Sequence, residues 1–308
     1  MGRALSNFYP VRRHHGCDVG MQHRWSAALR VVLGVGLLLS GVSAVGPASA
    51  ADPEAPVVKA ADGVIRGLTS SKVDSFLGIP FAAPPVGELR WRPPAPAAPW
   101  HGVRNAITDP PGCPQNEGGL LPGVGSSTED CLYLSVYRPA GSNTQTRLPV
   151  LFWMHGGGFG SGAGWLYDGS TLAQRNDVVV VTINYRLGAL GYLTSPALDA
   201  EQGNSGNYGF LDQIAALKWV HRNITAFGGD PSRVAISGQS AGGGSACAML
   251  ASPQAKGLFS SAIIQSWRLP DCAEVHGRGG RPRFGPRCWM HDRGRGSATE
   301  LPAQQVSS

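Results

Sequence analysis

The stretch from residue 234 to residue 250 constrains the fold of this chain most. It joins an apolar run to an Ala/Gly-rich segment through a Gly-x-Ser-x-Gly pentapeptide, which places Ser240 between Gly238 and Gly242. A buried strand, a sharp turn that carries a serine, and a helix are typical of this pattern. A serine hydroxyl alone is a weak nucleophile. The pattern therefore predicts a nucleophile that also needs a base and an acid to orient that base.

Three further apolar runs predict strands, at residues 149–154, 178–183 and 262–265. Continuous apolar runs of this kind suit a parallel sheet that is buried on both faces. Residues 208–227 carry apolar side chains at helical spacing, and a Gly-Gly pair follows them. Strands that alternate with helices predict an α/β fold with a mainly parallel central sheet.

The net charge of +6 is concentrated at the two ends of the chain. Residues 1–50 carry five Arg and one acidic residue, and residues 267–308 carry seven Arg and four acidic residues. The body between them, with 14 basic and 15 acidic residues, is nearly neutral. We therefore expect no nucleic-acid partner.

The N-terminal region has the pattern of a secretory signal peptide. Arg24 and Arg30 precede an apolar run at residues 31–39, and an A-x-A cleavage site ends at Ala50. We expect cleavage after Ala50, with residues 1–20 an over-extended start. The run is shorter than the ~20 residues of a membrane span, so no stable membrane anchor is expected after cleavage. Export would allow disulfide bonds to form.

A second glycine-rich motif, residues 155–159, follows the apolar run at 149–154 directly and reads His-Gly-Gly-Gly-Phe. Consecutive glycines let backbone N–H groups turn toward a ligand, as in the oxyanion holes of lipases and esterases. Two such motifs, each at the carboxyl end of a predicted buried strand, indicate one site at that edge of the sheet.

With these motifs the sequence resembles the type-B carboxylesterase family, the cholinesterase-like branch of the α/β-hydrolases. The resemblance covers about residues 56–266 and implies the N-terminal part of an α/β-hydrolase domain. It is carried by short motifs in matching order: residues 76–81 with 84–87, 129–134, 155–159, 184–186, 207–213, 227–231 and 238–242.

The resemblance implies roles for individual residues. Ser240 would be the nucleophile, and the N–H groups of Gly157, Gly158 and Ala241 would form the oxyanion hole. Cys113 and Cys131 match the first disulfide of the family. Two further matches are structural ion pairs of the family: Arg90 with Glu129, and Arg186 with Asp212. We interpret both pairs as structural because a buried charge without its partner costs several kcal/mol.

The implied reaction is hydrolysis of a small carboxylic ester through an acyl-enzyme, without a cofactor. The segment from Cys113 to Cys131 contains no aromatic residue. A quaternary ammonium group would therefore lack a cation–π partner there, which favours neutral aryl or short-chain alkyl esters over choline esters. A lipase that acts at lipid–water interfaces would carry the same motifs and is a further alternative.

The acid and histidine that the family places far downstream have no match in this chain. The resemblance stops at Trp267. The Arg/Gly/Pro-rich composition of the tail at 267–308 is typical of a shifted reading frame or a disordered segment. His276 and His291 lie in that tail, and no strand precedes either of them. We expect the C-terminal half of the fold to be missing and the chain to be weakly active or inactive. The alternative is a non-catalytic, cholinesterase-like binding module.

Overall fold

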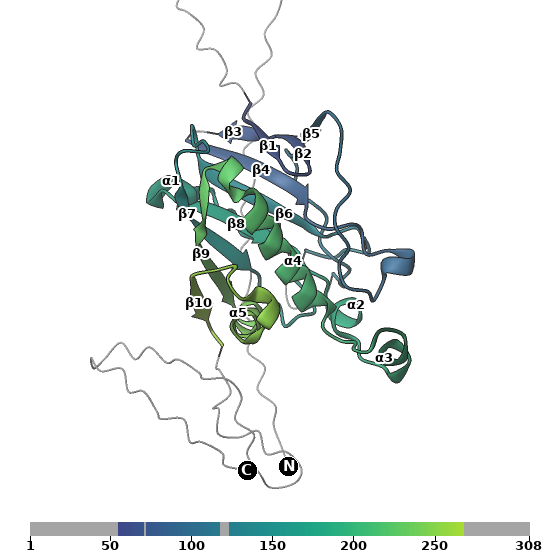
Figure 1. The fold of residues 1–308 in the computed structure, drawn as a ribbon. Helices are drawn as coiled ribbons and strands as arrows, with labels where there is room; N and C mark the ends of the chain where they lie inside the picture. The colour runs from purple at the N-terminus through teal and green to yellow at the C-terminus, as the bar shows by residue number, and fades with distance from the viewer. Residues whose placement is uncertain (1–54, 71, 118–122, 268–308) are drawn as a thin grey trace, which may run out of the picture. The chain divides into compact units, whose positions relative to one another are not determined.

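The computed structural model of the protein describes residues 55–70, 72–117 and 123–267 (Figure 1). Runs of β-branched and aromatic residues form neighbouring strands in it. Within these residues, a seven-stranded sheet has the order β10-β9-β7-β8-β6-β4-β3. The strands are β3 (Leu68–Ser70), β4 (Val73–Pro80), β6 (Tyr133–Pro139), β7 (Leu148–Met154), β8 (Val179–Ile183), β9 (Gly229–Gln239) and β10 (Ser261–Gln265).

The sheet divides into a parallel half and an antiparallel half. β10, β9, β7 and β8 run parallel to one another, whereas β6, β4 and β3 each run antiparallel to the preceding strand in the sheet. The four parallel strands are the four apolar runs from which strands were predicted. The described sheet is therefore mixed, and its parallel order belongs to the half that carries the glycine-rich motifs.

A small three-stranded sheet is separate from the main one. It pairs β1 (Val57–Ala60), β2 (Gly63–Arg66) and β5 (Val103–Asn105). The Pro-rich segment at residues 81–94 contributes no named strand and holds one short 3-10 turn at Gly87–Leu89. Proline lacks the N–H that a central strand must donate, which explains why no strand forms in this segment.

The predicted helix at 208–227 is present, but its last turn tightens. α4 (Tyr208–Asn223) continues into a 3-10 turn at Ile224–Phe227, and Gly228 ends it with a φ of 84°. The other helices of the described residues are α1 (Ser170–Asn176), α2 (Gly188–Tyr192), α3 (Pro196–Gln202) and α5 (Ala241–Ala251). In the part of the chain that the structure describes, none of the helices is long and apolar enough to cross a membrane.

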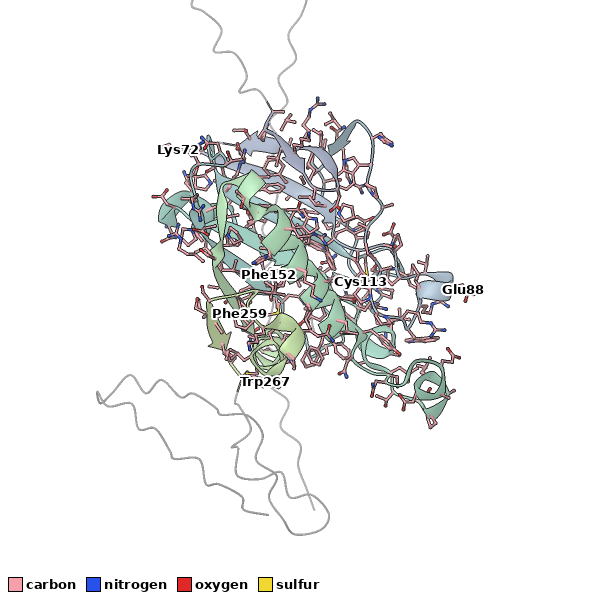
Figure 2. The ribbon with its side chains drawn as sticks, in the orientation of Figure 1. Lys72, Glu88, Cys113, Phe152, Phe259 and Trp267 are labelled. Atoms are coloured by element: carbon pink, nitrogen blue, oxygen red, sulfur yellow. A yellow bond between two sulfur atoms is a disulfide. The ribbon has the colours of Figure 1, made fainter. Side chains whose placement is uncertain are left out.

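Every residue of β8 is buried, as a strand covered on both faces requires. Val181 packs in the main core with Trp219 of α4 and with Phe152, which is fully buried (Figure 2). Val180 points to the opposite face and packs with Ala173 of α1. Helices thus cover both faces of the parallel strands.

The carboxyl ends of the parallel strands meet at one edge of the sheet. Met154, the last residue of β7, pairs with Ile183 at the end of β8 and with Gly238 near the end of β9. The segments that follow these strands therefore begin side by side. They are the His-Gly-Gly-Gly loop at residues 155–158, the Asn-Tyr-Arg motif at residues 184–186 and the turn at Ser240.

Candidate active site

Ser240 occupies the junction between β9 and α5, with a φ of 54° and a ψ of −123°. An L-residue seldom adopts a positive φ, and holding it there costs about 1–3 kcal/mol. The Ser240 N–H donates to the carbonyl oxygen of Gln265 in β10 at 2.9 Å. The Ser240 carbonyl oxygen accepts from the Gly244 N–H at 2.9 Å. These bonds tie the strained residue to a neighbouring strand and to the first turn of its helix.

Close backbone packing explains the two glycines of the pentapeptide. A Cβ atom at Gly238 would collide with the carbonyl group of Gly242, and a Cβ atom at Gly242 would collide with the carbonyl oxygen of Met154. β7 therefore passes directly against the turn. The pattern reflects a steric requirement at both positions.

The loop at residues 155–159 lies against the same turn. A Cβ atom at Gly156 would lie 3.3 Å from the Cβ atom of Ser240. Gly157 and Gly158 have φ values of 113° and 62°, and a Cβ atom at Gly157 would collide with the Ser161 carbonyl oxygen. Only glycine fits this path at Gly157, so the loop sequence follows from its geometry.

The N–H groups of Gly157 and Gly158 donate no hydrogen bond within the described residues. Ala241 is the first residue of α5, where an N–H has no acceptor inside the helix. The loop beside Ser240 and the helix N-terminus that follows it thus both carry backbone N–H groups without an acceptor among the described residues. Such donors can stabilise the negative oxygen of a tetrahedral intermediate.

His155 holds the loop and is no candidate for the base. Its ring is fully buried and stacks on Tyr185 with centroids 4.3 Å apart. Its Nδ1 lies 2.7 Å from the Gly156 carbonyl oxygen, which can only accept, so Nδ1 carries the proton. Burial lowers the pKa of His155 to about 4 and keeps the ring neutral at pH 7.

Two side chains that brace this loop were not singled out from the sequence. Tyr185 donates its hydroxyl to the His155 carbonyl oxygen at 2.7 Å. The Gln115 side chain accepts from the Gly162 N–H at 2.7 Å and donates to the Gly162 carbonyl oxygen at 2.9 Å. Tyr185 lies inside the Asn-Tyr-Arg motif, which was a usable signal. Gln115 carried none, because its partner is 47 residues away.

The Cys113–Cys131 disulfide predicted from the family resemblance is present, with Cα atoms 5.0 Å apart. Within the described residues, Cys247 is the free cysteine; it is half-buried on α5. The disulfide closes the loop that contains Gln115. It therefore supports the residue that braces the glycine-rich loop through Gly162.

The structure brings together both pairs of charged residues named above. Arg186 donates from Nε and Nη2 to the Asp212 carboxylate at 2.8 and 2.7 Å, and both side chains are buried. Arg90 donates to Glu129 at 2.7 and 2.6 Å, but these side chains are 41% and 22% exposed. The cost of an unpaired buried charge therefore applies to the first pair and not to the second.

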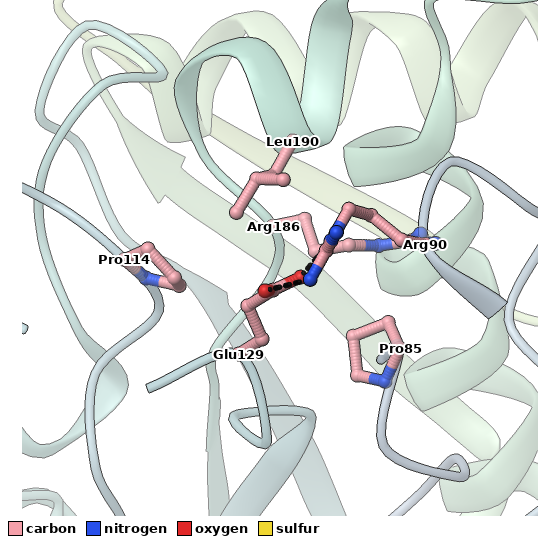
Figure 3. A pocket seen from close by; sticks show the side chains of 6 residues that line it. All are labelled: Pro85, Arg90, Pro114, Glu129, Arg186 and Leu190. Carbon is pink, nitrogen blue, oxygen red and sulfur yellow. Dashed lines mark hydrogen bonds and ion pairs between the residues drawn. The ribbon is translucent and has the colours of Figure 1, made fainter. Parts of the chain in front are cut away.

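Figure 3 shows the gap around Arg90 and Glu129, which Pro85, Pro114, Arg186 and Leu190 also line. It admits no water-sized sphere, so it is a packing gap and no substrate site. A larger open groove of about 540 Å³ lies between the segments 109–112 and 123–126, with Trp165 on its wall. Neither lining includes a residue of the turn at Ser240.

The Ser240 hydroxyl is half-buried and forms no hydrogen bond to a histidine or a carboxylate among the described residues. His101 and His221 are both exposed. His276 and His291 lie outside the described residues. No group of three or more His, Cys, Asp or Glu side chains that could hold a metal ion occurs in the described part of the chain.

A family model described as the carboxylesterase family matches residues 54–270. This span contains β1 to β10, both glycine-rich motifs, the disulfide and both ion pairs. This chain belongs to the carboxylesterase family.

Several curated members of the carboxylesterase family are similar to it. The chain is 47% identical over 230 residues to a pyrethroid hydrolase of Rattus norvegicus, 46% over 252 residues to the fumonisin B1 esterase of Sphingopyxis macrogoltabida, and 44% over 260 residues to the human cocaine esterase. The alignments cover 70%, 79% and 79% of this chain, and 40%, 46% and 45% of those proteins. The chain thus spans less than half the length of the curated relatives it matches.

Solved carboxylesterase structures are similar in fold to this chain. A thermophilic pNB esterase superposes with a TM-score of 0.63 at 45% identity, covering 69% of this chain and 44% of that chain. A Geobacillus stearothermophilus carboxylesterase gives a TM-score of 0.60 at 43% identity, covering 68% of this chain and 42% of the other. The predicted α/β-hydrolase fold is confirmed for the N-terminal portion of the domain.

Proposed function

We propose that the protein is a carboxylic ester hydrolase with Ser240 as its nucleophile. The observation that carries this proposal is the strained turn at Ser240 beside a glycine loop whose Gly157 and Gly158 N–H groups are unpaired. A backbone strain of this kind persists only where its surroundings hold it, and it concentrates at functional sites. Family membership and the names of the relatives support the same reaction class.

In the proposed reaction, the Ser240 Oγ attacks the carbonyl carbon of the ester as a base removes its proton. The carbonyl oxygen becomes an oxyanion that accepts hydrogen bonds from the N–H groups of Gly157, Gly158 and Ala241. Collapse breaks the bond to the alkoxy oxygen, and the alcohol leaves with a proton. Water then attacks the acyl-enzyme, which releases the carboxylic acid and frees Ser240.

We propose neutral esters as substrates, with aryl or short-chain alkyl groups. The disulfide loop offers no aromatic side chain to a cationic head group. Choline esters should therefore be hydrolysed no faster than matched neutral esters. A strong preference for the choline ester in a comparison of kcat/KM would refute this substrate class.

We also propose that hydrolysis by the 308-residue chain is slow. No histidine or carboxylate of the described residues reaches the Ser240 hydroxyl, so its proton has no base nearby. Ser240 can still attack slowly with water as the proton acceptor, because the oxyanion donors stabilise the intermediate that forms on it.

The test is hydrolysis of a neutral aryl ester by the purified chain and by its Ser240→Ala variant. We expect a slow rate that Ser240→Ala reduces to the background, while the exposed Ser127→Ala control keeps it. Equal rates for the parent and Ser240→Ala would refute Ser240 as the nucleophile. A fast parent rate abolished by Ser240→Ala would refute only the proposal that this chain hydrolyses esters slowly, and would support Ser240 as the nucleophile.

A covalent fluorophosphonate label separates the enzyme from a non-catalytic binding module of the same family. The proposed nucleophile should react slowly and at Ser240, as peptide mapping can show. A binding module would leave Ser240 unlabelled at every time point. The strained φ of Ser240 favours the enzyme, because a binding module has no use for that strain.

We propose that the protein is exported through the segment that ends at Ala50. The cleavage pattern of the sequence supports this, and so does the Cys113–Cys131 disulfide, because disulfides persist in oxidising compartments. N-terminal sequencing of the mature protein should begin at Ala51. A mature chain that retains residue 24 would refute the proposal.

A further inference from the structure

An aromatic side chain lies beside the oxyanion loop at the end of β10. Trp267 follows the last residue of β10 by two positions and is 43% exposed (Figure 2). Its ring centroid lies 6.3 Å from that of Phe159, with the two rings edge to face at 79°. Phe159 directly follows Gly158. Trp267 therefore borders the loop that presents the free N–H groups.

The indole of Trp267 is seated on the first turn of α5. A Cβ atom at Gly244 would lie 2.8 Å from the Trp267 Cε2 atom, and a Cβ atom at Gly243 would lie 3.0 Å from the Trp267 Cβ atom. Both glycines are needed for the ring to approach this closely. Since the Gly244 N–H donates to the Ser240 carbonyl oxygen at 2.9 Å, the ring lies one helical turn from the nucleophile.

Phe159 is a fixed neighbour for this ring, because other aromatic side chains hold it. Its centroid lies 5.1 Å from that of Tyr192 and 5.6 Å from that of Phe210, and the last two lie 5.3 Å apart. These three rings form a packed cluster, with Trp267 at its exposed end. One side of the indole rests on the helix, while much of the residue stays open to a ligand.

We infer that Trp267 is a specificity-determining residue that favours esters carrying an aromatic ring. The inference rests on the proposed function, in which the scissile carbonyl lies between Ser240 and the N–H groups of Gly157 and Gly158. An aryl group extending from that carbonyl toward β10 meets the exposed indole and the edge of Phe159. Aromatic rings prefer offset-stacked or edge-to-face contacts of this kind, which a saturated ring of the same size cannot make.

The test uses binding, so that it does not depend on catalysis. In the Ser240→Ala background, the dissociation constants of acetanilide and N-cyclohexylacetamide are measured by ligand-observed NMR titration. We expect acetanilide to bind more tightly. Trp267→Leu keeps apolar area but removes the ring, and should reduce this preference about two- to tenfold. No preference in the parent, or binding of neither compound, overturns the inference, and so does an unchanged preference in Trp267→Leu.

Gly244→Ala provides a second variant that displaces the ring without removing it. Its Cβ atom would contact the indole, so the aryl preference should fall as in Trp267→Leu, although alanine is the better helix former. Trp165→Leu, a half-buried tryptophan outside the aromatic cluster, is the matched control and should keep the preference. Aryl preference without Ser240-dependent hydrolysis would refute the proposed function alone.

Discussion

Arg186–Asp212 and Arg90–Glu129 have nearly the same bonding geometry in very different surroundings. Each is a guanidinium–carboxylate pair with two nitrogen–oxygen distances between 2.6 and 2.8 Å. The first pair is 2% and 0% exposed, and the second is 41% and 22% exposed. Bond length does not separate them. Burial decides the contribution to stability, because water solvates an exposed charge whose partner is lost.

The largest expected effect is that of Asp212→Ala. It leaves the Arg186 guanidinium buried without its carboxylate, which should lower the free energy of unfolding by about 3–5 kcal/mol. Urea denaturation followed by circular dichroism measures this loss. A loss below about 1 kcal/mol would show that the buried pair contributes no more to stability than an exposed one.

His155 tests whether burial acts in the same way on a group without a charged partner. Its pKa is about 4 in the folded protein, and an unfolded histidine has a pKa of about 6.5. Between these values the unfolded chain binds more protons, so stability is fully present above pH 6.5. It should be lost as the pH falls toward 4, by about 3 kcal/mol in total.

His155→Gln should remove this part of the slope of stability against pH, measured by urea denaturation at several pH values. The exposed His221→Gln is the matched control and should leave the slope as it is in the parent. An unchanged slope in His155→Gln would show that burial of the imidazole does not govern acid sensitivity.

The disulfide constrains the exposed pair through the backbone, because Glu129 lies within the loop that Cys113 and Cys131 close. Replacing both cysteines by alanine should lower stability by about 3 kcal/mol, through the entropy of an open loop of this length. The melting temperature of the double variant, compared with that of the free-cysteine control Cys247→Ala, measures this. Equal melting temperatures of the two variants would exclude a stabilising role for the disulfide.

The smallest effect is expected for Glu129→Ala. An exposed pair contributes about 0–1 kcal/mol, and salt screens it. The difference in stability from the parent should shrink further between low and high salt, whereas the Asp212→Ala difference should not. A Glu129→Ala loss as large as that of Asp212→Ala would show that exposure does not separate the two pairs.

Much of this architecture follows from local sequence. Each apolar run became a strand of the parallel half, and the turn at Ser240 follows from glycines that leave no room for a side chain. The roles of Gln115 and Trp267 could not be predicted in this way. Gln115 braces a loop 47 residues away, and Trp267 lies beyond the last family motif, so neither contact leaves a local pattern. The antiparallel pairing of β3, β4 and β6 could not be predicted either, because the pattern of a strand does not identify the strand beside it.

The bond from the Ser240 N–H to the Gln265 carbonyl oxygen has a consequence for the order of folding. This bond, which helps to hold the strained backbone at Ser240, can form only once β10 has docked beside β9, and β10 ends 25 residues after Ser240. During synthesis from the N-terminus, Ser240 therefore cannot make this bond until residue 265 has left the ribosome. The turn at Ser240 is thus among the last parts of the described fold to complete its hydrogen bonds.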